Sequence, residues 1–227
     1  SDYVDEEGNL SVNNQGIVDA MQLMKELQEA NAVSLVPGGN VDADEGYAAY
    51  ASGDFAVMIM PLWMSNRFIN YMSDLSGKIA VAPAPVVEDT KALSVGGGGT
   101  GTAVIKTSEN AELAAEFIAY AKLSADASII QWETLGNDPC NMSVWTDTSV
   151  TENPDNKYLN YYSNNPFDTL NEIKDGIVLL DSQTSQYYPS ISNIFNTVVF
   201  NAVFENGEDI QETLDLAQED LQNEFGY

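Results

Sequence analysis

The sequence predicts a helix-rich α/β protein in which the strands are few and short. Several segments carry apolar residues at the three- and four-residue spacing of an amphipathic helix. Continuous apolar runs, by contrast, have only the length of a strand, and prolines end them. With 227 residues, of which 44% are apolar, the chain can bury a substantial core without a disulfide or a metal ion.

The residues before the glycine run predict three helices and two strands. Asn13 and Asn14 can cap the first helix, because asparagine there accepts hydrogen bonds from free backbone N–H groups. The apolar stripe of that helix consists of Ile17, Met21, Met24 and Leu27. The elements after it are expected to be a short helix that begins at Asp42 or Asp44 and ends near Gly53, a buried strand over 55–60, a helix over 63–71 and a strand over 79–82.

The residues after the glycine run predict one strand and five helices. In order, we expect a strand over 102–105, a helix capped by Ser108, a helix containing Trp132, a short helix around Tyr158, a long buried helix from Ile191 to Val203 and a last helix opened by Asp209. The helix after Ser108 carries Leu113, Phe117 and Ile118, which need an apolar partner surface.

The charge balance is strongly acidic, since 35 aspartates and glutamates against 8 lysines and arginines give a net charge of −27. A phosphate backbone needs a basic patch, so this composition argues against nucleic acid as a partner and favours a neutral ligand or a cation. Histidine is absent, which removes histidine-dependent catalysis and histidine–metal sites. The single cysteine, Cys140, allows no intrachain disulfide. We expect no cofactor and no metal site.

The segment from Gly96 to Gly101 is unusual, because five of its six residues are glycine. It fits the letters of a dinucleotide-binding fingerprint, but that fingerprint opens a helix, and here a strand-like run follows. No Lys-Ser or Lys-Thr pair follows the glycines, so the segment is not a P-loop either. It is either a connection with positive φ angles or a place where bare backbone approaches a ligand.

Catalytic motifs have little support in this chain. So many carboxylates make chance acid pairs inevitable, and no Gly-x-Ser-x-Gly motif is present. The residues 42–46 resemble part of a calcium loop, but the glycine comes one place early and no glutamate follows in register. A solvated helix start is the favoured interpretation of that segment.

Aromatic residues indicate a binding function better than the acidic ones do. Trp63 comes just after the predicted buried strand, and Tyr187, Tyr188 and Phe195 gather at the start of the long helix. Tryptophan and tyrosine offer flat apolar faces with a polar edge, which suits the C–H faces and hydroxyls of sugars. Core packing is the alternative for each of these residues.

Several blocks stand in a distinctive order along the chain: 5–9, Gly53 to Ile59 with Trp63, 79–85, the glycine run, and Ala103 to Ile118. This order resembles the extracellular solute-binding proteins of ABC importers, in the sugar-binding, maltose-binding-protein-like family 1. The resemblance covers nearly the whole chain but only the C-terminal half of such a protein. We therefore expect the chain to be a fragment.

The resemblance implies a periplasmic-binding-protein-like type II fold, in which two α/β lobes close on a ligand. The chain would supply mainly the C-terminal lobe and part of the N-terminal lobe. Residues 1–98 would belong to the second lobe, residues 99–148 to the hinge crossing and a returning part of the first lobe, and residues 149–227 to the C-terminal helices of the second lobe.

The same resemblance implies carbohydrate-binding residues: Trp63, Gly97, Gly98, Gly99, Thr100, Tyr188 and Phe195. The function would be non-enzymatic binding of a neutral carbohydrate, expected to be an oligosaccharide, and delivery to the membrane subunits of an ABC permease. We expect an extracytoplasmic monomer, lipid-anchored at the cell surface or periplasmic. The alternatives are a carbohydrate-active enzyme that uses paired carboxylates and a structural cell-surface domain.

Overall fold

The computed structural model describes residues 2–86, 91–96 and 101–226. In this part of the protein the chain folds into two compact units. Unit 1 contains the residues up to 35 and those from 179 onward, and unit 2 contains residues 36–178.

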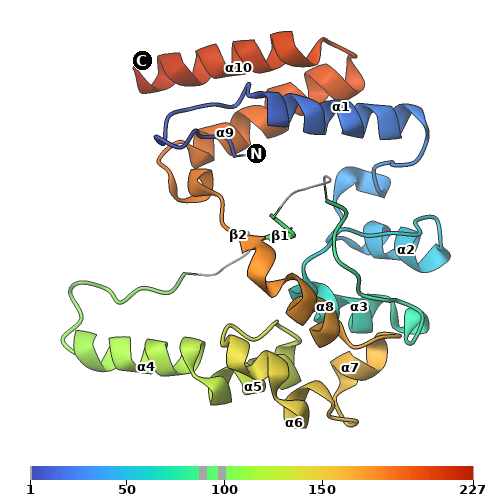
Figure 1. Ribbon diagram of the computed structural model, residues 1–227, viewed down its shortest axis with the longest axis vertical. Helices are drawn as coiled ribbons and strands as arrows, with labels where there is room; N and C mark the ends of the chain where they lie inside the picture. Colours follow the sequence, from blue (N-terminus) through green and yellow to red (C-terminus); the bar gives the residue numbers. More distant parts are fainter. Residues whose placement is uncertain (1, 87–90, 97–100, 227) are drawn as a thin grey trace. The chain divides into compact units, whose positions relative to one another are not determined.

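Three long helical segments pack together to form unit 1 (Figure 1). They are α1 (Gln15–Glu29), α9 (Tyr188–Ile194) with its π-helical continuation over Phe195–Val199 and Asn201–Glu205, and α10 (Ile210–Phe225). The Asn14 side chain accepts a hydrogen bond from the backbone of Ile17, and Asp209 caps α10 in the same way, as the sequence predicted. The buried stripes of the three segments face one another, and Ile191, Val199, Leu214 and Leu221 lie at the centre of this core.

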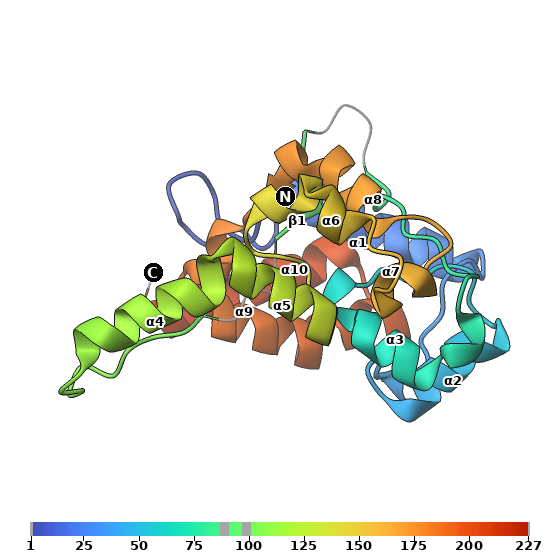
Figure 2. The same cartoon turned by 90° about the horizontal axis from the view of Figure 1, so that it is seen from below.

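Unit 2 contains shorter helices. They are α2 (Asp44–Ser52), α3 (Ser65–Tyr71), α4 (Ala111–Leu123), α5 (Ala125–Leu135), α6 (Thr148–Thr151), α7 (Lys157–Tyr161) and α8 (Pro166–Ile173). Single 3-10 turns in the chain cover Pro37–Gly39, Leu62–Met64, Ser73–Leu75, Met142–Thr146, Lys174–Gly176 and Asp181–Thr184. Figure 2 shows α3 between α2 and α7.

The sheet of unit 2 is smaller than the sequence predicted. Within the described residues it consists of two short parallel strands, β1 (Ser94–Val95) and β2 (Ile177–Val178), with Ser94 opposite Ile177. Gly176, next to β2, permits a close approach, because a Cβ there would lie 2.5 Å from the side chain of Leu93. The sequence showed neither strand, because two-residue segments carry no periodicity.

The predicted strands over 55–60 and 102–105 are wrong, since the structure assigns neither segment to a strand. Val57 and Ile59 are 74% and 78% exposed, so the expected cover on both faces of the first segment is absent. Phe55, Met58 and Met60 are half-buried and pack onto the core, and exposed and half-buried residues alternate only from Val57 to Met60. A strand needs a neighbour that supplies hydrogen bonds, and that neighbour is not encoded in the segment itself. The strand over 79–82 is reduced to one bridge from Ile79 to Tyr162.

Two hydrophobic cores hold unit 2 together. One joins α2, α3 and α7 through Tyr47, Tyr50, Phe68 and Tyr161. The other surrounds Trp132 of α5, which is fully buried against Tyr158 and Phe167. Leu62 and Ile69 contact both cores, so α5 shares its packing with the region around α3.

The helix α4 contrasts with α5, because none of its residues is buried. Leu113, Phe117 and Tyr120 are 66%, 67% and 57% exposed, and both views show α4 extending beyond the other helices of unit 2 (Figures 1 and 2). Within the described residues, Leu113 and Phe117 therefore lack the expected partner surface, whereas Ile118 is half-buried.

The boundaries of the compact units, near residues 35 and 178, differ from the predicted lobe boundaries at 98 and 148. Assignment of these segments to lobes stays a prediction. None of the helices described is both long enough and apolar enough to cross a membrane.

Candidate functional site

Trp63 lies where the extended segment that ends at Pro61 turns into α3. The 3-10 turn Leu62–Met64 makes this corner, and Met64 is buried beneath it. Trp63 itself is half-buried and only partly packed against the core of unit 2. One part of the indole therefore stays open, as an aromatic platform for a ligand requires.

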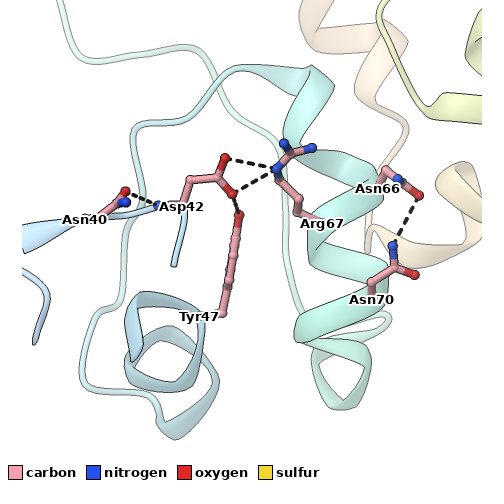
Figure 3. Close-up of polar contacts among 6 residues, drawn as sticks. All are labelled: Asn40, Asp42, Tyr47, Asn66, Arg67 and Asn70. Atoms are coloured by element: carbon pink, nitrogen blue, oxygen red, sulfur yellow. Dashed lines mark hydrogen bonds and ion pairs between the residues drawn. The ribbon is translucent and has the colours of Figure 1, made fainter. Parts of the chain in front are cut away.

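Arg67 follows Trp63 by four residues, so both side chains lie on one face of the helix start. The guanidinium carbon of Arg67 is 5.5 Å from the centre of the Trp63 ring, which is a cation–π contact. Its Nε donates hydrogen bonds to both carboxylate oxygens of Asp42, at 2.8 and 3.1 Å (Figure 3). Asp42 therefore fixes the orientation of the arginine beside the tryptophan.

The carboxylate of Asp42 also accepts a hydrogen bond from the hydroxyl of Tyr47, which points up from α2 (Figure 3). The hydrogen bond from Tyr47 and, to a smaller extent, the one from Arg67 hold the pKa of Asp42 below its usual value. Burial and the bond to Asp42 raise the pKa of Tyr47 above its ordinary value. Near neutral pH Asp42 is thus an anion and Tyr47 a neutral donor.

A cavity of about 400 Å³ opens beside these three side chains. Its lining combines acidic, amide, cationic and aromatic groups: Asp42, Ala43, Asp44, Tyr47, Asn66, Arg67, Asn70 and Tyr71. The rings of Tyr47 and Tyr71 are stacked with their centres 4.9 Å apart and an angle of 7° between the planes. Tyr47 is buried and Tyr71 is 55% exposed, so the stack has one open aromatic face. A polar molecule with an apolar face fits such a lining.

A second cavity, of about 270 Å³, lies between α6, α7 and α8. Its amide side chains already form hydrogen bonds to backbone groups of the protein. Asn160 donates to Pro154, Asn164 bonds both backbone groups of Val81, and Asn165 caps α8. This second cavity therefore offers fewer free polar groups than the one beside Arg67.

The other predicted binding residues either belong to unit 1 or fall outside the described residues. Gly97, Gly98, Gly99 and Thr100 lie outside the described residues. Tyr188 begins α9 in unit 1 and is 40% exposed.

Phe195 is 4% exposed in the core of unit 1, where its ring meets Tyr3 edge-on at 5.0 Å. Trp63 belongs to unit 2. Its partial exposure leaves part of the ring open to a ligand, and the binding role of each residue stays a prediction.

The residues that surround Arg67 cannot be identified from the sequence, which predicts Asp42 or Asp44 as the start of a helix. The carboxylate of Asp42 instead pairs with Arg67 of α3. α2 begins at Asp44, and Ala43 occupies its cap position. One signal was present: Trp63, Arg67 and Tyr71 recur every four residues, and this spacing puts them on one side of a helix.

Residues 1–127, more than half of the chain, match the family described as bacterial extracellular solute-binding proteins. The chain belongs to this family. Membership confirms the predicted resemblance and places the chain in a class of binding proteins rather than enzymes. Membership also confirms the expectation that the protein belongs to an extracellular family, and it does not show how the protein would be anchored.

Two curated relatives of this solute-binding protein are similar over nearly its whole length. Both are named arabinooligosaccharide-binding protein: one from Halalkalibacterium halodurans is 37% identical over 98% of this chain, and one from Bacillus subtilis is 35% identical over 97%. The alignments cover 49% and 51% of these two proteins. The chain therefore spans about half the length of the curated relatives it matches.

The fold also resembles a solved structure. This is the ABC transporter associated binding protein from B. animalis subsp. lactis Bl-04, solved in complex with β-1,6-galactobiose. The TM-score is 0.69 at 16% identity, and the match covers 97% of this chain and 54% of the other. At this identity the similarity concerns the fold alone.

Proposed function

We propose that this protein is the oligosaccharide-binding component of an ABC importer, and that it binds a neutral carbohydrate without transforming it. The observation that carries the proposal is the partly open ring of Trp63, held next to Arg67 and a polar cavity. An aromatic face beside hydrogen-bonding groups is what a sugar ring requires. Family membership and the names of the two relatives support the same ligand class.

The charge of the chain supports a neutral ligand. An anion is normally held by an arginine whose charge is not already balanced by a carboxylate, or by the N-terminus of a helix. Arg67 is already paired with Asp42, and Asp44 also lines the cavity. The net charge of −27 would slow the approach of an anion, most strongly at low salt.

The lobe arrangement forms part of the proposal. Residues 1–98 and 149–227 would contribute to the second lobe, and 99–148 to the crossing and the first lobe. The exposed apolar residues of α4 support this division, because a surface of that kind is normally covered in the folded protein. The core around Trp132 of α5 argues against it, because Leu62, which the division assigns to the other lobe, packs against that core.

The remaining parts of the predicted site belong to this proposal too. The backbone at Gly97 to Thr100 would contact the sugar, and Tyr188 would add a second aromatic face. Phe195 would contribute only if its helix exposed it, since its ring is enclosed within unit 1. Closure of the lobes would present the loaded protein to the permease as an extracytoplasmic monomer that is lipid-anchored or periplasmic.

Calorimetry on the protein encoded by the complete gene tests the function. We expect binding of neutral arabinose oligosaccharides and no binding of sugar phosphates, at both low and high ionic strength. Preferential binding of a sugar phosphate would contradict the neutral-ligand proposal. Steady release of product from aryl glycosides would favour the enzyme alternative, and no thermal shift with any sugar would favour a structural role.

A further inference from the structure

We propose that the cavity lined by Asp42, Asn66, Arg67, Asn70 and Tyr71 is a carbohydrate subsite of its own. It would hold one neutral sugar unit next to the unit that stacks on Trp63. This inference rests on the proposed function, because it takes the ligand to be an oligosaccharide. No comparison assigns a role to these residues.

Tyr71 lines the subsite, and more than half of its side chain is exposed. The ring is stacked on the buried ring of Tyr47 at 4.9 Å, so its position is fixed before any ligand arrives. Because the Tyr47 hydroxyl is bonded to Asp42, the lower ring is also held in place. A preorganised aromatic face loses little conformational entropy when a sugar covers it.

The wall of the subsite retains unused hydrogen-bonding capacity. Arg67 uses Nε for Asp42, and its terminal nitrogens have no hydrogen-bond partner within the described residues. Asn70 donates to the Oδ1 of Asn66 at 3.5 Å, which leaves the carbonyl of Asn70 and the N–H groups of Asn66 for a ligand (Figure 3). The lining thus offers both donors and acceptors, as neighbouring sugar hydroxyls require.

The size and charge of the cavity fit the same ligand. Its volume of about 400 Å³ lies in the range of small-molecule sites, which begins at about 300 Å³. The opposite charges of Asp42 and Arg67 cancel within the site, and the carboxylate of Asp44 in the lining disfavours an anion. The subsite therefore suits an uncharged polyol.

Arg67 connects this cavity to Trp63. Its guanidinium lies 5.5 Å from the indole centre, while its Nε faces the carboxylate that lines the cavity. Because Arg67 covers one face of the indole, the sugar unit on Trp63 would use the other face or the edge of the ring, and the next unit of the same chain would enter the cavity beside Arg67. Affinity would rise with oligosaccharide length as the second unit enters the subsite.

Calorimetry with arabinose and arabinotriose, on the protein encoded by the complete gene, tests this subsite. We expect Tyr71→Ala to weaken triose binding about five- to tenfold, the scale of a lost aromatic contact. Asn70→Ala, which alters an exposed rim residue, should weaken it in the same direction with little change in Tm. Leu216→Ala is the control, because Leu216 is 63% exposed on α10 and does not line the cavity.

The outcomes separate the two proposals. Weaker triose binding in both cavity variants, with unchanged binding in the Leu216→Ala control, supports the subsite. Unchanged binding in both cavity variants, while Trp63→Ala binds less, overturns the subsite and leaves the proposed function intact. No binding of either sugar by the wild-type protein overturns both.

Discussion

Replacing Trp63 by alanine separates a ligand platform from a core residue. Aromatic side chains bury about 150–250 Å² when fully enclosed, and the fold has already covered part of Trp63. A sugar that covers about 100 Å² of the remaining face contributes up to about 2.5 kcal/mol at 25 cal/mol per Å². With incomplete contact and an added stacking term, we expect a loss of about 1–3 kcal/mol in binding, or about 5- to 150-fold in Kd.

Calorimetry measures the affinity, and urea unfolding of the same variant measures its stability. Trp132→Ala is the control, because Trp132 has no exposed surface and packs against Phe167 at 4.9 Å. It should lose about 3–5 kcal/mol of stability, the usual cost of emptying a core site. If Trp63→Ala lost as much stability as this control while its affinity stayed unchanged, Trp63 would be a core residue and the platform argument would fail.

Two further predictions concern the fold of unit 2. Burial raises the pKa of Tyr161 from 10.0 to about 12, and its hydroxyl donates to the carbonyl of Met72 at 2.8 Å. The folded state thus favours the protonated phenol, so its stabilising effect is complete below pH 10 and is lost as pH rises toward 12. Urea midpoints measured across this range should fall less for Tyr161→Phe than for the wild type; parallel curves would exclude Tyr161 as the cause. Gly136→Ala should cost more than about 2 kcal/mol, because φ is +71° there and the new Cβ would lie 2.6 Å from the ring of Tyr158. Gly53→Ala is its control, with φ at +85° but no atom within 4 Å, and should cost only about 1 kcal/mol; equal losses would mean that the contact with Tyr158 relaxes freely.

Helices and their ends could be predicted from the sequence because their determinants are local. Asn14 and Asp209 cap α1 and α10 through backbone N–H groups within three residues of themselves. Gly53 ends α2 in the left-handed conformation that glycine adopts without steric cost. Blocks of residues in a fixed order were also sufficient for recognition of the family.

The strands and the candidate subsite depended on tertiary structure, because their partners are distant in sequence. The apolar run over 55–60 has the composition of a strand, but hydrogen bonding in a sheet requires a neighbour that the run does not encode. Arg67 meets Asp42 across a separation of 25 residues, and Tyr71 reaches the ring of Tyr47 from a different helix. Sequence by itself determined that Trp63, Arg67 and Tyr71 share one helix face. Packing of α2 against α3 decided what that face meets, because only the folded chain brings the carboxylate of Asp42 within hydrogen-bond distance of Arg67.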